Sequence, residues 1–182
     1  MKTMLKRFSK KDFTATNILI IITVLMYIIQ INISQGGLFL GLNLYFLVYD
    51  FWWQPLSTMF AHGGIAHLGM NMFVLWQFGN LIERFRGAKE LVALYFITGI
   101  ATSLLSFLYI FYLDPQVNLV GASGAICALL GYVAYFDKTQ RNGIITWVLL
   151  ISVVPLIIGL PIAWYAHFIG LAVGFLYGII RR

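Results

Sequence analysis

The sequence predicts an all-α membrane protein with six transmembrane helices and a long interfacial first loop. Its 182 residues are 61% hydrophobic and 10% charged, and the mean hydropathy is +0.89. Soluble domains average about 45–50% apolar and about 25% charged residues. Apolar runs near the roughly 20 residues that a crossing helix needs recur along the chain, and Lys and Arg are confined to alternate loops. A soluble domain and a disordered chain are excluded, and one cysteine excludes a disulfide framework.

The chain begins with a basic segment, residues 1–16, followed by an apolar span over 17–33. A signal peptide also begins this way. However, no Ala-x-Ala-like site follows, whereas further apolar spans do. We therefore expect 1–16 to be a cytosolic amino-terminal segment and 17–182 to be one six-helix transmembrane domain.

The segment between the first two spans, about residues 34–64, is apolar and aromatic. Tryptophan and tyrosine favour the lipid headgroup region, where one ring edge stays hydrated. Glycines and polar residues within the segment disfavour a second crossing, so we expect this loop to lie in the membrane interface. Its aromatic residues are Phe39, Tyr45, Phe46, Tyr49, Phe51, Trp52 and Trp53.

Five further spans follow the loop. Their hydrophobicity and length predict helices over about 65–82, 91–112, 123–136, 144–158 and 162–180.

The positions of the charges predict the topology. All twelve Lys and Arg lie before the first span, between spans two and three, between spans four and five, or after the sixth. The charges of the remaining loops are Asp50 and Asp114. The positive-inside rule then places both termini in the cytosol and requires an even number of spans. The basic residues form no stripe for nucleic acid, and we expect a multi-pass protein of the bacterial cytoplasmic membrane.

Polar side chains gather where spans two, four and six begin, at the outer face. The fourth span has about 14 residues and covers roughly 21 Å of a hydrocarbon core about 30 Å thick. Ser123, at its start, should therefore lie below the outer surface, where water reaches it only through a cavity. The gathered residues are His62, His67, Asn71, Ser123 and His167.

Ser123 and His167 form a candidate catalytic pair, because a neutral imidazole can take the proton of a serine nucleophile. Each residue alone has a simpler interpretation. Ser123 could cap its helix, and His167 could join two helices by a hydrogen bond. Their matched depth favours catalysis.

Small residues predict that spans four and six are in contact. Small faces allow helix backbones to approach closely. The packing face coincides with the face that carries the reactive pair. The small residues are Gly124, Ala128 and Gly131 on span four and Gly170, Gly174 and Gly178 on span six.

Span two offers donors for an oxyanion. His67 and Asn71 lie one helical turn apart on one face, and the Ser123 N–H can join them. Such donors typically contribute a factor of about 10²–10³ each.

Two alternatives concern the same region. The three histidines could hold zinc, but no carboxylate or thiolate joins them as a base. Cys127 could be a nucleophile, although an internal apolar cysteine is usually inert. Because Asp50 and Asp114 lie in loops, a Ser–His dyad is expected instead of a triad.

Taken together and in order, these residues resemble the rhomboid family of intramembrane serine proteases over nearly the whole chain. The matching pieces are His62, His67 and Asn71, the run Gly121-Ala122-Ser123-Gly124, His167 with Gly170 and Gly174, and Glu83-Arg84 with Gly87.

The resemblance implies a rhomboid-like bundle with Ser123 as nucleophile and His167 as general base and acid. It also implies an oxyanion hole of Asn71, His67 and the Ser123 N–H, water access from the external side, and neither metal nor cofactor. Substrates would be single-span membrane proteins, and the enzyme would bind them within the membrane lipid. Two positions depart from the family pattern: Gln54 follows Trp53 where the family often has arginine, and Cys127 stands where it often has tyrosine.

The expected function is therefore that of an intramembrane serine endopeptidase. The alternative is a non-catalytic relative that binds transmembrane clients, although such proteins usually lack the serine or the histidine. A transporter or channel is disfavoured, because no Asp, Glu, Lys or Arg falls within the six spans.

Overall fold

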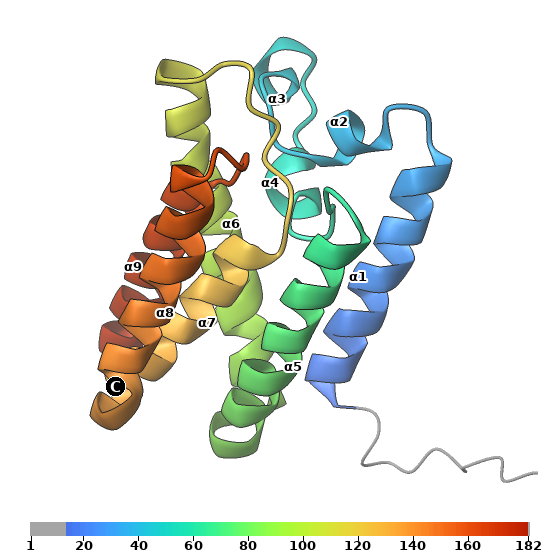
Figure 1. Cartoon of the computed structure of the whole chain (residues 1–182). Coiled ribbons are helices and arrows are strands. Elements are labelled where there is room, and N and C mark those ends of the chain that lie inside the picture. The colour runs from blue at the N-terminus through green and yellow to red at the C-terminus, as the bar shows by residue number, and fades with distance from the viewer. Residues whose placement is uncertain (1–13, 182) are drawn as a thin grey trace, which may run out of the picture.

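Among the described residues, six long helices form the body of the protein, and three short helices lie at one end of it (Figure 1). The computed structural model describes residues 14–181, so most of the expected amino-terminal segment lies outside the described residues. Each long helix begins within six residues of its expected start. The long helices are α1 (Ala15–Asn32), α5 (Ile65–Arg86), α6 (Ala88–Tyr112), α7 (Ser123–Phe136), α8 (Lys138–Ile157) and α9 (Trp164–Ile180).

The apolar surface of these helices is that of a membrane protein. Within the described residues, α1, α6 and α8 are each long and apolar enough to cross a bilayer. Large side chains such as Ile21 and Leu25 of α1 are about half exposed, at 53% and 54%. Contiguous apolar exposure of this kind suits a lipid environment. The protein is an all-helical, multi-pass membrane protein, as the composition predicted.

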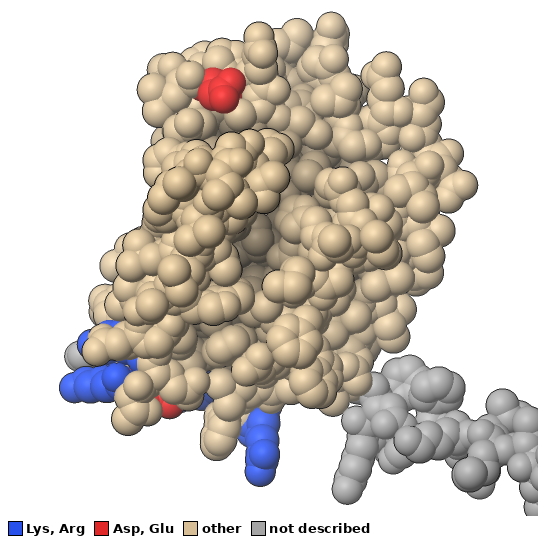
Figure 2. All heavy atoms as spheres, in the orientation of Figure 1, with Lys and Arg blue, Asp and Glu red and all other residues tan. Residues whose placement is uncertain are grey.

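Charged side chains divide between the two ends of the bundle. Figure 2 shows Lys and Arg gathered at the lower end, with an acidic patch at the upper end. At the basic end, Arg181 pairs with Glu90 at 2.8 Å. The Tyr132 hydroxyl donates to Glu90 at 3.2 Å and accepts from Arg86 Nε at 2.9 Å. This cluster joins α5, α6 and α7 to the carboxyl end of α9.

The largest shift from the predicted boundaries is at α8, which begins at Lys138 instead of near 144. Asp137 caps the helix by accepting the backbone N–H groups of Thr139 and Gln140. The Thr139 side chain, with that of Gln140, also lowers the pKa of Asp137 to about 2. An acidic cap extends a helix into a polar segment because it satisfies the first free N–H groups.

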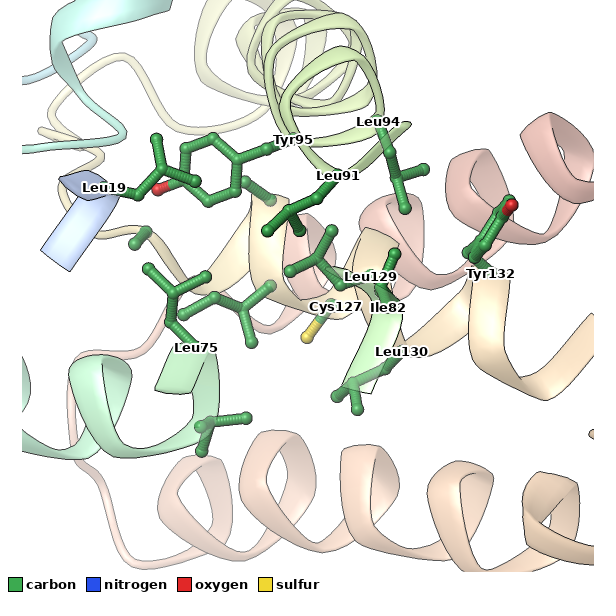
Figure 3. Close-up of a cluster of buried hydrophobic side chains, with 14 of the residues drawn as sticks. Leu19, Leu75, Ile82, Leu91, Leu94, Tyr95, Cys127, Leu129, Leu130 and Tyr132 are labelled. Atoms are coloured by element: carbon green, nitrogen blue, oxygen red, sulfur yellow. The ribbon is translucent and has the colours of Figure 1, made fainter. Parts of the chain in front are cut away.

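Helix α7 lies at the centre of the bundle, and most of its side chains are buried. Figure 3 shows its Leu129 beside Leu91 of α6, in a buried cluster that also includes its Leu130 and Leu75 of α5. Lipid tails are as apolar as leucine, so burial from water does not hold these helices together. Close packing of side chains stabilises the bundle.

Helices α7 and α9 are in backbone contact, as the small residues predicted. A Cβ atom added at Gly170 would overlap the carbonyl oxygen of Gly124, and one at Gly174 would overlap that of Ala128. On the other helix, a Cβ at Gly131 would overlap the carbonyl of Leu171. Any larger side chain at these positions would force the two helices apart.

Glu83 of α5 attaches the start of α1. Its carboxylate accepts the backbone N–H groups of Ala15 and Thr16 at 2.8 and 2.9 Å, and the Thr16 hydroxyl at 2.8 Å. The first N–H groups of a helix have no partner in their own helix, and a negative charge there is favourable. Glu83, on a neighbouring helix, therefore satisfies the free N–H groups at the start of α1.

Replacing Glu83 by Gln is expected to lower the free energy of unfolding by about 1.5–3 kcal/mol, since bonds to a charged acceptor are lost. Titration of the folded protein with denaturing detergent would measure the change. Lys89→Gln removes an exposed charge nearby and serves as the control. Equal unfolding of both variants would contradict the role of Glu83.

The expected interfacial loop contains three short helices, α2 (Gly36–Leu40), α3 (Tyr45–Val48) and α4 (Gln54–Ser57). The side chain of Gln54 is fully buried and bonds to the Leu38 carbonyl at 3.0 Å and the Asn43 N–H at 3.3 Å. The amide thus holds this loop together at the position where the family often has arginine. Its location in the membrane interface stays a prediction.

Candidate active site

One cavity of about 1350 Å³ contains the predicted reactive residues. It is lined from α5, α7, α8 and α9, and from the segments 113–122 and 158–163. His67, Asn71, Ser123 and His167 all border it. The structure therefore brings together four of the five polar residues singled out at the span starts.

Ser123 lies deep because the preceding segment descends into the protein. In Figure 1 the chain after α6 runs from the upper end of the bundle down to the start of α7. Leu119 exchanges two backbone hydrogen bonds of 2.8 Å with Leu42. The Thr58 hydroxyl donates to the Leu119 carbonyl at 2.6 Å, and the Thr58 carbonyl accepts the Gly121 N–H at 3.0 Å. The aromatic loop thus fixes where α7 begins.

The Ser123 hydroxyl is not used to cap its helix. Ser123 is the first residue of α7, the cap position is Ala122, and within residues 14–181 no side-chain capping bond forms there. The interpretation of Ser123 as an N-cap is therefore wrong. Its side chain stays available to the cavity, because the turn at Gly121 places the capping position one residue earlier.

Gly121 allows the His67 ring to approach Ser123. Its φ of +130° lies in the region that glycine favours. A Cβ atom at this position would lie 2.9 Å from His67 Nε2 and 3.6 Å from Ser123 Oγ. The imidazole and the hydroxyl therefore share the space beside Gly121.

The tautomer of His67 follows from the hydrogen bond that its Nδ1 accepts. The Gly63 N–H donates to His67 Nδ1 at 3.4 Å. A neutral imidazole has one protonated nitrogen, so the proton is on Nε2, the nitrogen that lies beside Gly121. His67 can therefore donate a hydrogen bond into the cavity. Asn71 Nδ2 donates one hydrogen to the His67 carbonyl at 2.9 Å and has a second to offer.

His167 reaches the cavity from the first turn of α9 and is 4% exposed. Its Nδ1 lies 3.0 Å from the hydroxyl of Ser152 on α8. Between residues 14 and 181, no hydrogen bond joins His167 to Ser123. Catalytic hydrogen bonds often tighten only when substrate is bound. Sequence reasoning missed Ser152, which is one of two hydroxyl-bearing residues in the apolar span 144–158.

The alternative groups are arranged as follows. Cys127 is 1% exposed, although it borders the cavity. His62 is buried behind His67, with the two ring centroids 5.1 Å apart. Asp114 also borders the cavity. Among the described residues, no three His, Cys, Asp or Glu side chains come together as metal ligands.

Fold and site define a helical membrane protein whose cavity carries a serine, two histidines and an asparagine. The chain belongs to the rhomboid family, because the family model for the Rhomboid domain matches residues 49–182.

Curated relatives come from a plant, bacteria and yeast. RHOMBOID-like protein 4 of Arabidopsis thaliana is 37% identical over 136 residues, which cover 70% of this chain and 34% of that protein. Rhomboid protease GluP of Bacillus subtilis (strain 168) is 36% identical over 91 residues, covering 50% and 17%. Rhomboid protease AarA of Providencia stuartii is 32% identical over 157 residues, covering 75% and 56%. The match thus spans between 17% and 56% of these relatives.

Proposed function

We propose that the protein is an intramembrane serine endopeptidase, which hydrolyses peptide bonds in or near transmembrane segments of membrane-protein substrates. The observation that carries the proposal is the shared cavity of Ser123, His167, His67 and Asn71. Family membership supports it, because GluP and AarA are named proteases.

In the proposed reaction, Ser123 Oγ attacks the carbonyl carbon of the scissile peptide bond while His167 takes the hydroxyl proton. The tetrahedral intermediate collapses, the C–N bond breaks, and His167 gives the proton to the departing amine. Water then attacks the acyl-enzyme by the same route and releases the carboxylic acid. The hydrogens of Asn71, His67 Nε2 and the Ser123 N–H stabilise the oxyanion.

The proposed orientation places the basic end of the bundle in the cytosol. The cavity is bordered by 113–122 and 158–163, segments that join helices away from that end (Figures 1 and 2). Water and an unwound substrate segment would therefore enter from the external side. The bacterial cytoplasmic membrane stays a prediction, since the relatives include mitochondrial proteins of a plant and of yeast.

A fluorophosphonate probe tests the proposal directly, because it reacts covalently with activated serines. We expect labelling of the purified protein in detergent and none of Ser123→Ala. A second arm follows cleavage of a labelled single-span substrate on a gel. Absence of labelling and of cleavage in the folded wild type would favour the alternative, a non-catalytic protein that binds transmembrane clients.

Asn71→Ala is expected to lower kcat by about 10²–10³-fold, because one oxyanion donor is lost. Cleavage kinetics in detergent would measure the effect. Asn80→Ala is a matched control on the same helix, since Asn80 Nδ2 also donates to the carbonyl four residues earlier, that of Trp76, at 2.7 Å. An equal effect of the two substitutions would contradict the role of Asn71.

A further inference from the structure

We propose that Ser152 of α8 is a positioning residue for His167, which holds the imidazole in the tautomer that can act as a base. The inference rests on the proposed function, in which His167 takes the proton of Ser123. It concerns a residue outside the expected dyad and oxyanion hole.

The direction of the hydrogen bonds follows from the chemistry of the three groups. Ser152 Oγ lies 2.6 Å from the carbonyl oxygen of Val148 and 3.0 Å from His167 Nδ1. A carbonyl oxygen can only accept, so this short contact between two oxygens uses the one hydrogen of the hydroxyl. The Ser152 oxygen therefore presents a lone pair to His167, and Nδ1 must carry the proton.

This arrangement leaves His167 Nε2 as the basic nitrogen. A neutral imidazole carries one proton, and with Nδ1 protonated Nε2 has a free lone pair. When His167 becomes charged during the reaction, the Nδ1–H bond to Ser152 persists and strengthens. The two hydrogen bonds, from His167 to Ser152 and from Ser152 to the Val148 carbonyl, polarise each other and so strengthen the contact further.

In a catalytic triad, a carboxylate holds the histidine in the correct tautomer. Here the Ser152 hydroxyl takes the place of that carboxylate. Within residues 14–181, no carboxylate forms a hydrogen bond with His167. Ser152 is fully buried and His167 nearly so, and water competes little for the bond. Cys127 has no aromatic ring on which the imidazole of His167 could stack. The hydrogen bond with Ser152 of α8 orients the imidazole instead.

Nitrogen NMR of the ¹⁵N-histidine-labelled protein in micelles tests the tautomer independently of activity. The chain has three histidines, and the His167 resonances are assigned by their loss in His167→Asn. We expect a protonated Nδ1 and an unprotonated Nε2 in the wild type. In Ser152→Ala we expect the two tautomers to mix. A protonated Nε2 in the wild type, or unchanged spectra in Ser152→Ala, would overturn the proposal.

Kinetics provide the second readout. Ser152→Ala is expected to lower kcat by about 10- to 100-fold, the worth of one hydrogen bond to a charged group, with little change in KM. Ser152→Thr should restore most of the rate and the wild-type tautomer, because threonine keeps the hydroxyl. Failure of threonine to restore either would count against the proposal.

Thr23→Val is the matched control, since Thr23 is a buried hydroxyl on α1 that donates to the Leu19 carbonyl at 2.7 Å. We expect its rate and spectra to match the wild type. If Ser152→Ala does not fold, the wild-type spectrum and Ser152→Thr still decide the matter. Undiminished cleavage by Ser123→Ala would refute the proposed dyad. It would leave the role of Ser152 standing, because the His167 tautomer is measured without substrate.

Discussion

Replacing Ser123 by alanine is expected to lower kcat for a single-span substrate by at least about 10⁴-fold. Alanine has no hydroxyl to attack the peptide carbonyl, and loss of a serine nucleophile typically costs this much or more. Ser123 is partly exposed to the cavity and caps no helix, so the variant should fold normally. Cleavage is measured on a gel in detergent, and folding by the thermal unfolding midpoint.

His167→Ala should reduce kcat to a similar level, because the hydroxyl then has no base. The double variant should be little worse than either single one, since the two residues act as a unit. Undiminished cleavage by Ser123→Ala would refute the dyad. Additive losses in the double variant would show that the two residues act in separate steps.

Gly174→Val is expected to destabilise the bundle by more than about 3 kcal/mol. Overpacking a core usually costs about 1–3 kcal/mol when side chains can adjust. At Gly174 the new carbon would meet the backbone carbonyl of Ala128, which has no rotamer to change. The unfolding midpoint in detergent and retention of cleavage activity measure the effect.

Gly143→Ala is the control for this prediction. Gly143 lies within α8, and no atom of the described residues lies within 4 Å of a Cβ added there. Alanine there should leave stability unchanged or raise it by up to about 1 kcal/mol through helix propensity. If Gly174→Val unfolded at the wild-type temperature, α7 and α9 would not be in the backbone contact described.

Much of the fold could be predicted because membrane helices follow simple rules. Apolar length and the positions of Lys and Arg located the six long helices. Two features depended on polar contacts that hydropathy does not describe. Asp137 extends α8 by capping it, and buried Gln54 organises the short helices of the aromatic loop.

Most of the candidate site could also be predicted, because spacing and shared depth place side chains near one another. His67, Asn71, Ser123 and His167 were expected at similar depth, and they share one cavity. The partner of the His167 ring could not be found in this way. A serine in an apolar helix usually bonds to its own backbone, and Ser152 does so while also meeting an imidazole 15 residues away.

The glycine contacts between α7 and α9 have a consequence for how the site tolerates change. The separation between the two backbones that carry Ser123 and His167, the proposed nucleophile and base, is set by main-chain atoms in contact with main-chain atoms. Substitutions on the lipid-facing sides of these helices can accumulate without altering that separation. The polypeptide backbone therefore fixes the frame of the proposed pair, and side-chain contacts such as that of Ser152 with His167 orient the reacting groups within it.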